Sequence, residues 1–221
     1  MFQGFSEETT QFLWGIRFNN EKPWFEAHKQ HYLDYVQAPL RELAQEVYEG
    51  FSAAHPEQPL MMRISRIYRD ARRLYGRGPY KSHLWFNLRM AGEDWARMPA
   101  FWFGIHPAGY SYGMGVFDAR PADMAKFRAV IDRDPGPMLA LAQNFARQDR
   151  FVLDAEEYKR SKGNPPAPLD QWYNRKGIEL TCQRPIDSLL YSRDLLDDIL
   201  TGYEALMPYY HYFATLFRRE E

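Results

Sequence analysis

Apolar positions in the first fifty residues recur every three or four residues, which is the spacing of one face of an α-helix. Ser6 is placed to cap the first predicted helix and Asn20 the second. Pro39 should break or kink this second helix, because proline has no backbone N–H. Residues 1–52 should therefore form a helical layer. The inner side of its third helix is predicted to carry Leu40, Leu43, Ala44, Val47 and Phe51.

Alternation of apolar and polar residues replaces this spacing between residues 60 and 118, which indicates β-strands. Residues 84–90 alternate in this way. Two aromatic stretches, 100–106 and 110–117, flank the turn Pro107-Ala108-Gly109 and give the clearest hairpin signal of the chain. The middle of the chain is therefore predicted to form antiparallel strands.

Helical spacing returns in residues 121–221. Residues 161–168 are instead a polar, proline-rich loop that could act as a mobile lid. The last helix should run over Arg193–Arg218, with Ser192 as its cap. This order of helices, strands and helices argues for an α+β fold in one domain, residues 1–221. We expect a mostly antiparallel sheet of about four to six strands, packed by the N-terminal and C-terminal helices.

The composition is that of a folded protein and excludes several classes. Of 221 residues, 45% are hydrophobic and 16% aromatic, which argues against disorder. A net charge of −1 gives no global basic field for non-specific nucleic-acid binding. The single cysteine, Cys182, allows no intramolecular disulfide and no cysteine-based metal site. No window approaches the roughly 18 apolar residues of a membrane span. We therefore expect a cytoplasmic protein without a membrane partner.

Positive charge is concentrated in one stretch, Arg63–His83. It holds seven of the 28 lysines and arginines of the chain and one acid, Asp70. Its secondary structure is ambiguous, because it fits neither a helical nor an alternating pattern cleanly. The Ile and Tyr content favours a strand over residues 61–68, followed by a loop over residues 70–79. Such a strand and loop can present arginines to a ligand from a fixed position.

The residue types in this stretch point to an anionic ligand. A guanidinium is a planar fork that binds phosphate or carboxylate through two hydrogen bonds, and a lysine adds a point charge. An acid could orient an arginine, and a histidine could act as acid or base. No Gly-x-x-x-x-Gly-Lys phosphate loop is present. We predict that an anionic, phosphate-bearing small molecule is bound by Arg66, Arg69, Asp70, Arg72, Tyr80, Lys81 and His83.

Two other interpretations of the stretch stay open. A nucleic-acid or protein interaction module would use the arginines together with exposed aromatic side chains, and its binding to single strands would weaken steeply with salt. We favour this less, because aromatic residues on strands are more typical of a core. The aromatic residues in question are Trp85, Phe101, Trp102, Phe103, Tyr110 and Tyr112. In the other interpretation, the arginines serve only as internal ion pairs.

Two histidines, in His28-x-x-His31, have the spacing of a helical metal site. No acid follows at ligand distance on the same face, and a metal needs three or four convergent ligands. We therefore expect a half-buried histidine pair, and we predict neither a metal nor a cofactor. Nothing in the sequence identifies a reaction, so the questions of enzymatic activity and oligomeric state stay open.

Four short motifs, taken together and in order, resemble the domain of unknown function 2461 family. They are Asn19-Asn20 followed by Trp24-Phe25, then Arg66-Ile67-Tyr68-Arg69-Asp70-Ala71-Arg72, then Pro79-Tyr80-Lys81, then Gly113-Met114-Gly115. One departure is visible, because the family tends to carry an aromatic residue after the arginine that aligns with Arg72. The resemblance implies no activity, since the function of the family is itself unassigned. It singles out the same arginine stretch as the charge count.

Overall fold

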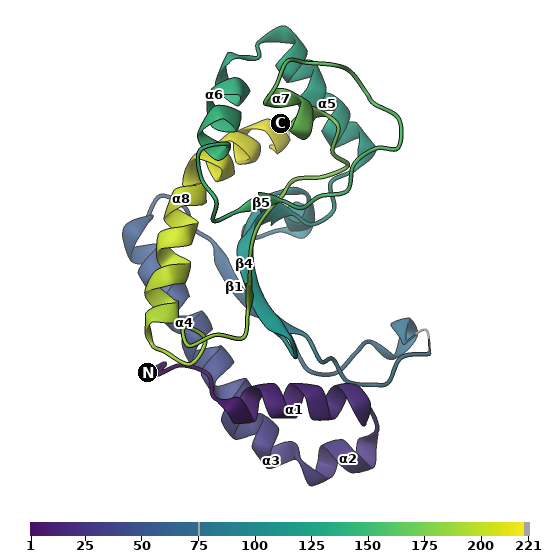
Figure 1. Cartoon of the computed structure of the whole chain (residues 1–221), viewed down its shortest axis with the longest axis vertical. Helices are drawn as coiled ribbons and strands as arrows, with labels where there is room; N and C mark the ends of the chain where they lie inside the picture. Colours follow the sequence, from purple (N-terminus) through teal and green to yellow (C-terminus); the bar gives the residue numbers. More distant parts are fainter. Residues whose placement is uncertain (75, 219–221) are drawn as a thin grey trace. The chain divides into compact units, whose positions relative to one another are not determined.

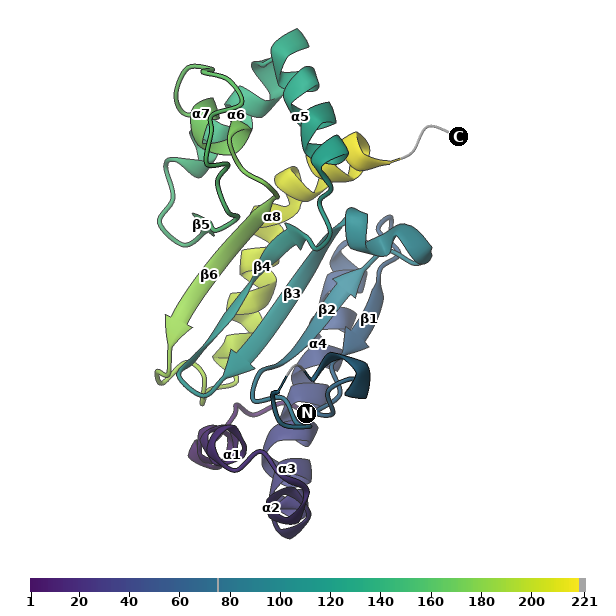
Figure 2. The ribbon, with the colours of Figure 1, turned by 90° about the vertical axis from the view of Figure 1, so that its right-hand side faces the viewer.

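The computed structural model describes residues 1–74 and 76–218, and the backbone alone at Arg73 and Glu93. Its strands form one antiparallel sheet in the order β1-β2-β3-β4-β6-β5 (Figure 2). The α+β fold and the mostly antiparallel sheet predicted from the sequence are confirmed. The strands are β1 (Met61–Ile64), β2 (Leu84–Arg89), β3 (Pro99–His106), β4 (Gly109–Val116), β5 (Val152–Leu153) and β6 (Glu179–Pro185).

Helices precede and follow most of the strands (Figure 1). The N-terminal set is α1 (Glu7–Phe18), α2 (Lys22–Ala27), α3 (Lys29–Tyr32), the π-helical turn η1 (Leu33–Gln37) and α4 (Ala38–Ala54). Two 3₁₀ turns, η2 (Ala71–Arg73) and η3 (Glu93–Arg97), lie between strands. The later helices are α5 (Pro121–Arg133), α6 (Gly136–Phe145), α7 (Leu169–Tyr173) and α8 (Asp194–Phe217). No helix in the described ranges is long and apolar enough to cross a membrane.

The chain divides into two compact units. Unit 1 comprises Met1–Leu88, Trp102–Tyr112 and Gln183–Thr201. Unit 2 comprises Arg89–Phe101, Gly113–Cys182 and the described residues from Gly202 onward. The arginine stretch, the first helices and the start of α8 therefore belong to unit 1.

Pro39 does not break the helix in unit 1. Helical structure is continuous from Lys29 to Ala54, and the π-helical turn η1 directly precedes α4, which has Pro39 in its first turn. A residue with an N–H at this position would donate to the carbonyl of Tyr35, four residues earlier. The fully buried hydroxyl of Thr9 donates to this carbonyl instead, at 2.5 Å.

The core of unit 1 lies between the sheet and its helices. In Figure 2, α4 runs along one face of β1 and β2. Leu84, Phe86 and Leu88 alternate along β2, so they share one of its faces, and all three are fully buried. The ring of Phe103 in β3 stacks on Phe86 and on Phe5, with ring centroids 5.4 and 6.1 Å apart. Phe103, Tyr110 and Tyr112 are fully buried, as predicted for core aromatics.

The core of unit 2 is built around Trp172 of α7, which is 1% exposed. Its ring stacks on Tyr209 of α8 with 5.9 Å between ring centroids, and the Tyr209 hydroxyl donates to the carbonyl of Leu141 in α6 at 3.1 Å. At the first turn of α5, the buried carboxylate of Asp123 accepts hydrogen bonds from Arg97. Both polar contacts and apolar packing therefore hold the helices of this unit in place.

Three local predictions can be compared with the structure. Strand β1 ends at Ile64, so the strand expected over residues 61–68 is too long by four residues. The oxygen of the Ser192 hydroxyl accepts a hydrogen bond from the Asp194 N–H at 3.1 Å, so Ser192 caps the last helix as predicted. Residues 161–168 contain neither helix nor strand, as expected for a loop.

Candidate functional site

The arginine stretch is held to the sheet by main-chain hydrogen bonds beyond the end of β1. The Ser65 N–H donates to the Trp85 carbonyl at 2.8 Å, and the Trp85 N–H donates to the Ser65 hydroxyl oxygen at 2.9 Å. Further on, Tyr68 and Tyr80 form an isolated antiparallel bridge. The Lys81 N–H donates to the Ile67 carbonyl at 2.7 Å. This bridge places Lys81 beside the arginines that precede the loop.

Asn20 fixes the far side of the bridge. Its side-chain amide donates to the Tyr80 carbonyl at 2.9 Å, and its oxygen accepts from the Tyr80 N–H at 2.9 Å. The cap of α2 is Glu21, so the expectation that Asn20 caps this helix is wrong. A Cβ atom at Gly78 would lie 2.3 Å from the Asn20 side-chain oxygen, which explains the glycine there. The first and third sequence motifs therefore meet in the fold.

The side chain of Tyr80 packs against aromatic rings in this arrangement. Its side chain is 3% exposed, and its ring stacks on Phe25 of α2 with 4.3 Å between ring centroids. Burial, with the field of Tyr68 and Glu26, raises the pKa of its phenol. Tyr80 thus contacts other aromatic rings, whereas the sequence analysis placed it among the ligand-binding residues.

The arginines of the stretch differ in their partners. Arg72, whose side chain is 88% exposed, forms a bidentate ion pair with Asp70. Its Nε donates to Oδ1 at 3.0 Å and its Nη2 to Oδ2 at 2.8 Å. Asp70 also accepts from the Arg72 N–H at 3.0 Å and so caps η2. Arg69 is half-buried, and its Nε donates to the Tyr80 carbonyl at 2.8 Å. Arg66 is exposed, because its neighbour Ile67 is the residue that points into the core.

Arg66, Arg69 and Lys81 form a group of like charges, which we call the basic cluster. The pKa of Lys81 is lowered by burial and by the fields of Arg69 and Arg66. Burial and the field of Arg77 lower the pKa of Arg69. Within the described residues, neither Arg66 nor Lys81 has an ion pair with an acid. The cluster therefore concentrates positive charge that no carboxylate of the described chain neutralises.

His83 adjoins the basic cluster on the side of β3. Its ring nitrogen Nε2 lies 2.5 Å from where a Cβ atom at Gly104 would stand, so the glycine makes room for the imidazole. The side chain of His83 is exposed, and the desolvation that it still undergoes lowers its pKa, with the fields of His106 and Lys81 acting in the same direction. The rings of His83 and His106 are 6.4 Å apart. Sequence reasoning did not connect His106 with this site, because only the hairpin register brings it there.

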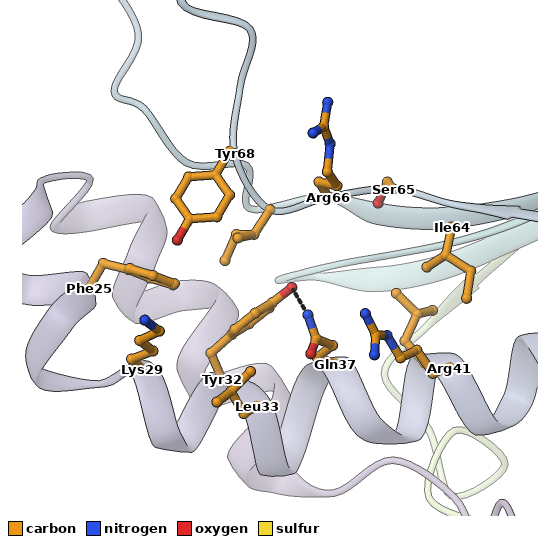
Figure 3. Close-up of a pocket in the computed structure, with 12 residues that line it drawn as sticks. Phe25, Lys29, Tyr32, Leu33, Gln37, Arg41, Ile64, Ser65, Arg66 and Tyr68 are labelled. Atoms are coloured by element: carbon orange, nitrogen blue, oxygen red, sulfur yellow. Dashed lines mark hydrogen bonds between the residues drawn. The ribbon is translucent and has the colours of Figure 1, made fainter.

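A pocket of about 550 Å³ lies beside the segment Ile64–Tyr68 (Figure 3). Its lining holds three cationic side chains, Lys29, Arg41 and Arg66, and no acid. No sequence pattern predicted this pocket, because its walls come from α2, α3, η1, α4 and the end of β1. The remaining lining residues are Phe25, Tyr32, Leu33, Gln37, Leu40, Ile64, Ser65, Ile67 and Tyr68.

The two histidines with metal-ligand spacing make other contacts. The ring of His28 stacks on Trp24 at 4.0 Å, and its Nδ1 lies 2.8 Å from the Trp24 carbonyl. Nε2 of His31 lies 3.2 Å from the carbonyl of Glu8. Over residues 1–74 and 76–218, no group of three or more His, Cys, Asp and Glu side chains is arranged to hold a metal ion.

The fold and these surfaces define an α+β protein with a bridge between Tyr68 and Tyr80, a basic cluster and a pocket lined by three cations. The profile of the family of conserved hypothetical proteins DUF2461 matches residues 8–212. This match covers most of the chain, so the protein belongs to that family, as the motifs predicted. No curated protein matches the chain.

Proposed function

We propose that the protein binds an anionic, phosphate-bearing small molecule through Arg66, Arg69 and Lys81, with His83 beside them. The observation that carries this proposal is the like-charge surrounding of Lys81. Holding three cations together lowers the stability of the unliganded protein, and a bound anion would reverse the repulsion. Functional sites are where such unfavourable charge arrangements concentrate.

The structural ion-pair interpretation accounts for only part of the stretch. Arg72 fits the structural interpretation, because Asp70 accepts hydrogen bonds from both Nε and Nη2 of its guanidinium. The Nε of Arg69 donates to the Tyr80 carbonyl, and the other two nitrogens of its guanidinium can still bind a ligand. Arg66 and Lys81 have no acid partner among the described residues. We therefore place ligand binding on Arg66, Arg69 and Lys81 and leave Arg72 and Asp70 outside the site.

The test is a binding measurement with matched variants. The purified protein is titrated calorimetrically with inorganic phosphate, nucleotides, sugar phosphates and small carboxylates. We expect a phosphate-bearing compound to bind, and Arg66→Gln and Lys81→Gln each to weaken it by about tenfold or more, since each removes a charge-assisted hydrogen bond. Arg63→Gln removes an exposed arginine of β1 outside the cluster and should leave binding unchanged.

Two further readouts separate the alternatives. Lys81→Gln should leave the melting temperature of the unliganded protein unchanged or raise it, because it relieves repulsion. If the arginines and Lys81 were structural ion pairs, the same change would lower it. Tight binding of single-stranded oligonucleotides with a steep salt dependence, and of no small phosphate, would instead favour the nucleic-acid module. Failure of every anion to bind would contradict the proposal.

The cellular compartment is part of the same proposal. The single cysteine, Cys182, is buried and carries no disulfide. Cysteine usage of this kind suits a reducing compartment. We propose that the protein acts in the cytoplasm, where phosphorylated small molecules are the substrates and ligands that it would meet.

A further inference from the structure

The pocket beside Ile64–Tyr68 has an apolar floor and a charged rim. Phe25, Tyr32, Leu40 and Ile67 are all buried and supply the floor. The cations Lys29 and Arg41 are exposed at the helical side of the opening. A volume of about 550 Å³ lies within the range of pockets that bind small molecules. This distribution fits a ligand with an apolar body and an anionic end.

Polar donors converge at one end of the pocket. Nε2 of Gln37 donates to the Tyr32 hydroxyl oxygen at 3.3 Å, and Figure 3 shows the Arg41 guanidinium beside Gln37 on the same face of the helix. Burial raises the pKa of Tyr32, against the opposing effects of Gln37 and Arg41. Among the described residues, no acceptor takes the hydroxyl proton of Tyr32, and no acid pairs with Arg41. Two donors are therefore available for one anion.

Lys29 cannot share that anion. It lies twelve residues before Arg41 on a continuous helical segment, which corresponds to about 18 Å along the helix axis. Arg66 also lines the pocket, but Figure 3 shows its guanidinium extending away from Tyr32 and Arg41. The anionic end of a ligand therefore belongs beside Arg41, and the apolar floor extends from there toward Lys29.

We propose that this pocket binds a small amphipathic anion, a carboxylate or phosphate ester on an aliphatic or aromatic body. The anion accepts hydrogen bonds from the Arg41 guanidinium and the Tyr32 hydroxyl, and the body covers Phe25, Leu40 and Ile67. Its two donors come from α3 and α4 and are not members of the basic cluster, whose Arg66 lines the pocket with its guanidinium extending away from them. The inference therefore does not rest on the proposed function.

Calorimetric titration of the full chain tests the proposal. The probes are octanoate, 4-phenylbutyrate and hexyl phosphate. Acetate and inorganic phosphate lack the body, and 1-octanol lacks the charge. We expect at least one amphipathic anion to bind about tenfold or more tightly than every one of these analogues, because both the charge and the buried area contribute. The carboxylate and phosphate probes show which head group the site prefers.

Variants then locate the binding. Arg41→Gln and Tyr32→Phe should each weaken it about tenfold, and Leu33→Trp should abolish it by filling the pocket. Arg63→Gln and Lys81→Gln, which alter an unrelated arginine and the basic cluster, should leave it unchanged. Tyr32→Phe keeps the buried ring, so it serves as the second test if another variant folds poorly. Absence of binding by all three probes, or binding by Arg41→Gln and Tyr32→Phe that is as tight as binding by the wild-type protein, would overturn the proposal.

Discussion

Replacing Thr9 by valine should destabilise unit 1 although the two side chains have nearly the same shape. Thr9 is fully buried, its hydroxyl donates to the Tyr35 carbonyl at 2.5 Å, and its oxygen accepts from the Ser6 N–H at 3.2 Å. Valine removes both hydrogen bonds. Pro39, four positions after Tyr35, has no N–H that could replace the lost donor to the Tyr35 carbonyl.

The magnitude follows from the carbonyl that is left without a donor. An unsatisfied buried polar group costs roughly 1–3 kcal/mol. A loss of about 2 kcal/mol corresponds to a fall in melting temperature of about 4–8 °C for a chain of this size. Urea unfolding, followed by circular dichroism, measures the free energy directly, with an unchanged m-value showing that the unfolded state is unaffected. Thr10→Val is the matched control, since the Thr10 hydroxyl bonds only to Glu7 within the same helix.

A double-mutant cycle tests the reason for the loss. In the Pro39→Ala background, the new N–H can donate to the Tyr35 carbonyl, so Thr9→Val should cost at least about 1 kcal/mol less than in the wild type. Equal costs in the two backgrounds would refute the link between the proline and the threonine hydroxyl. A change of less than about 0.5 kcal/mol on Thr9→Val in the wild type would refute the importance of the hydrogen bond itself.

Two further predictions concern other parts of the chain. Gly113→Ala should lower the free energy of unfolding by about 3 kcal/mol in urea titrations, because the new Cβ would lie 1.9 Å from the Leu180 carbonyl oxygen. Gly177→Ala is the control, and it should change the free energy of unfolding little, because its Cβ would lie 3.6 Å from its nearest neighbour. His83 and His106 both have a lowered pKa in the folded protein. The unfolded chain therefore binds protons first as the pH falls below about 6.5, so stability should fall from there toward the lowered pKa values. Between about pH 5 and 7, the free energy of unfolding should depend less steeply on pH in His83→Gln than in the wild type. An unaltered slope would contradict the lowered pKa of His83 in the folded protein.

Local patterns predicted the parts of the fold that depend on neighbouring residues. The hairpin of β3 and β4 follows from alternation around a tight turn, and Ser192 caps the last helix through a residue two positions away. Long-range partners decided the elements that were mispredicted. Asn20 bonds to Tyr80 across sixty residues instead of capping α2, and Thr9 supplies the donor that lets the helix pass Pro39.

The same distinction explains what the sequence could say about function. The charge count predicted the basic cluster, because an excess of positive residues can be counted in the sequence without knowing the fold. It could not show that Arg72 is occupied by Asp70 or that Tyr80 is buried, since both depend on how the loop closes. The pocket left no signal at all, because its polar end is built from Tyr32, Gln37 and Arg41, none of which stands out within a helix.

The short segment Ile64–Tyr68 contributes residues to both candidate sites, since Arg66 belongs to the basic cluster and also lines the pocket. Ile67 is buried, and Ile64 and Tyr68 line the pocket, while the Arg66 guanidinium extends away from it (Figure 3). The segment therefore carries a buried apolar residue, Ile67, directly next to an exposed arginine, Arg66. We expect binding to the two surfaces to respond to different variants, which is why Lys81→Gln serves as a control for the pocket and Arg63→Gln as a control for both surfaces.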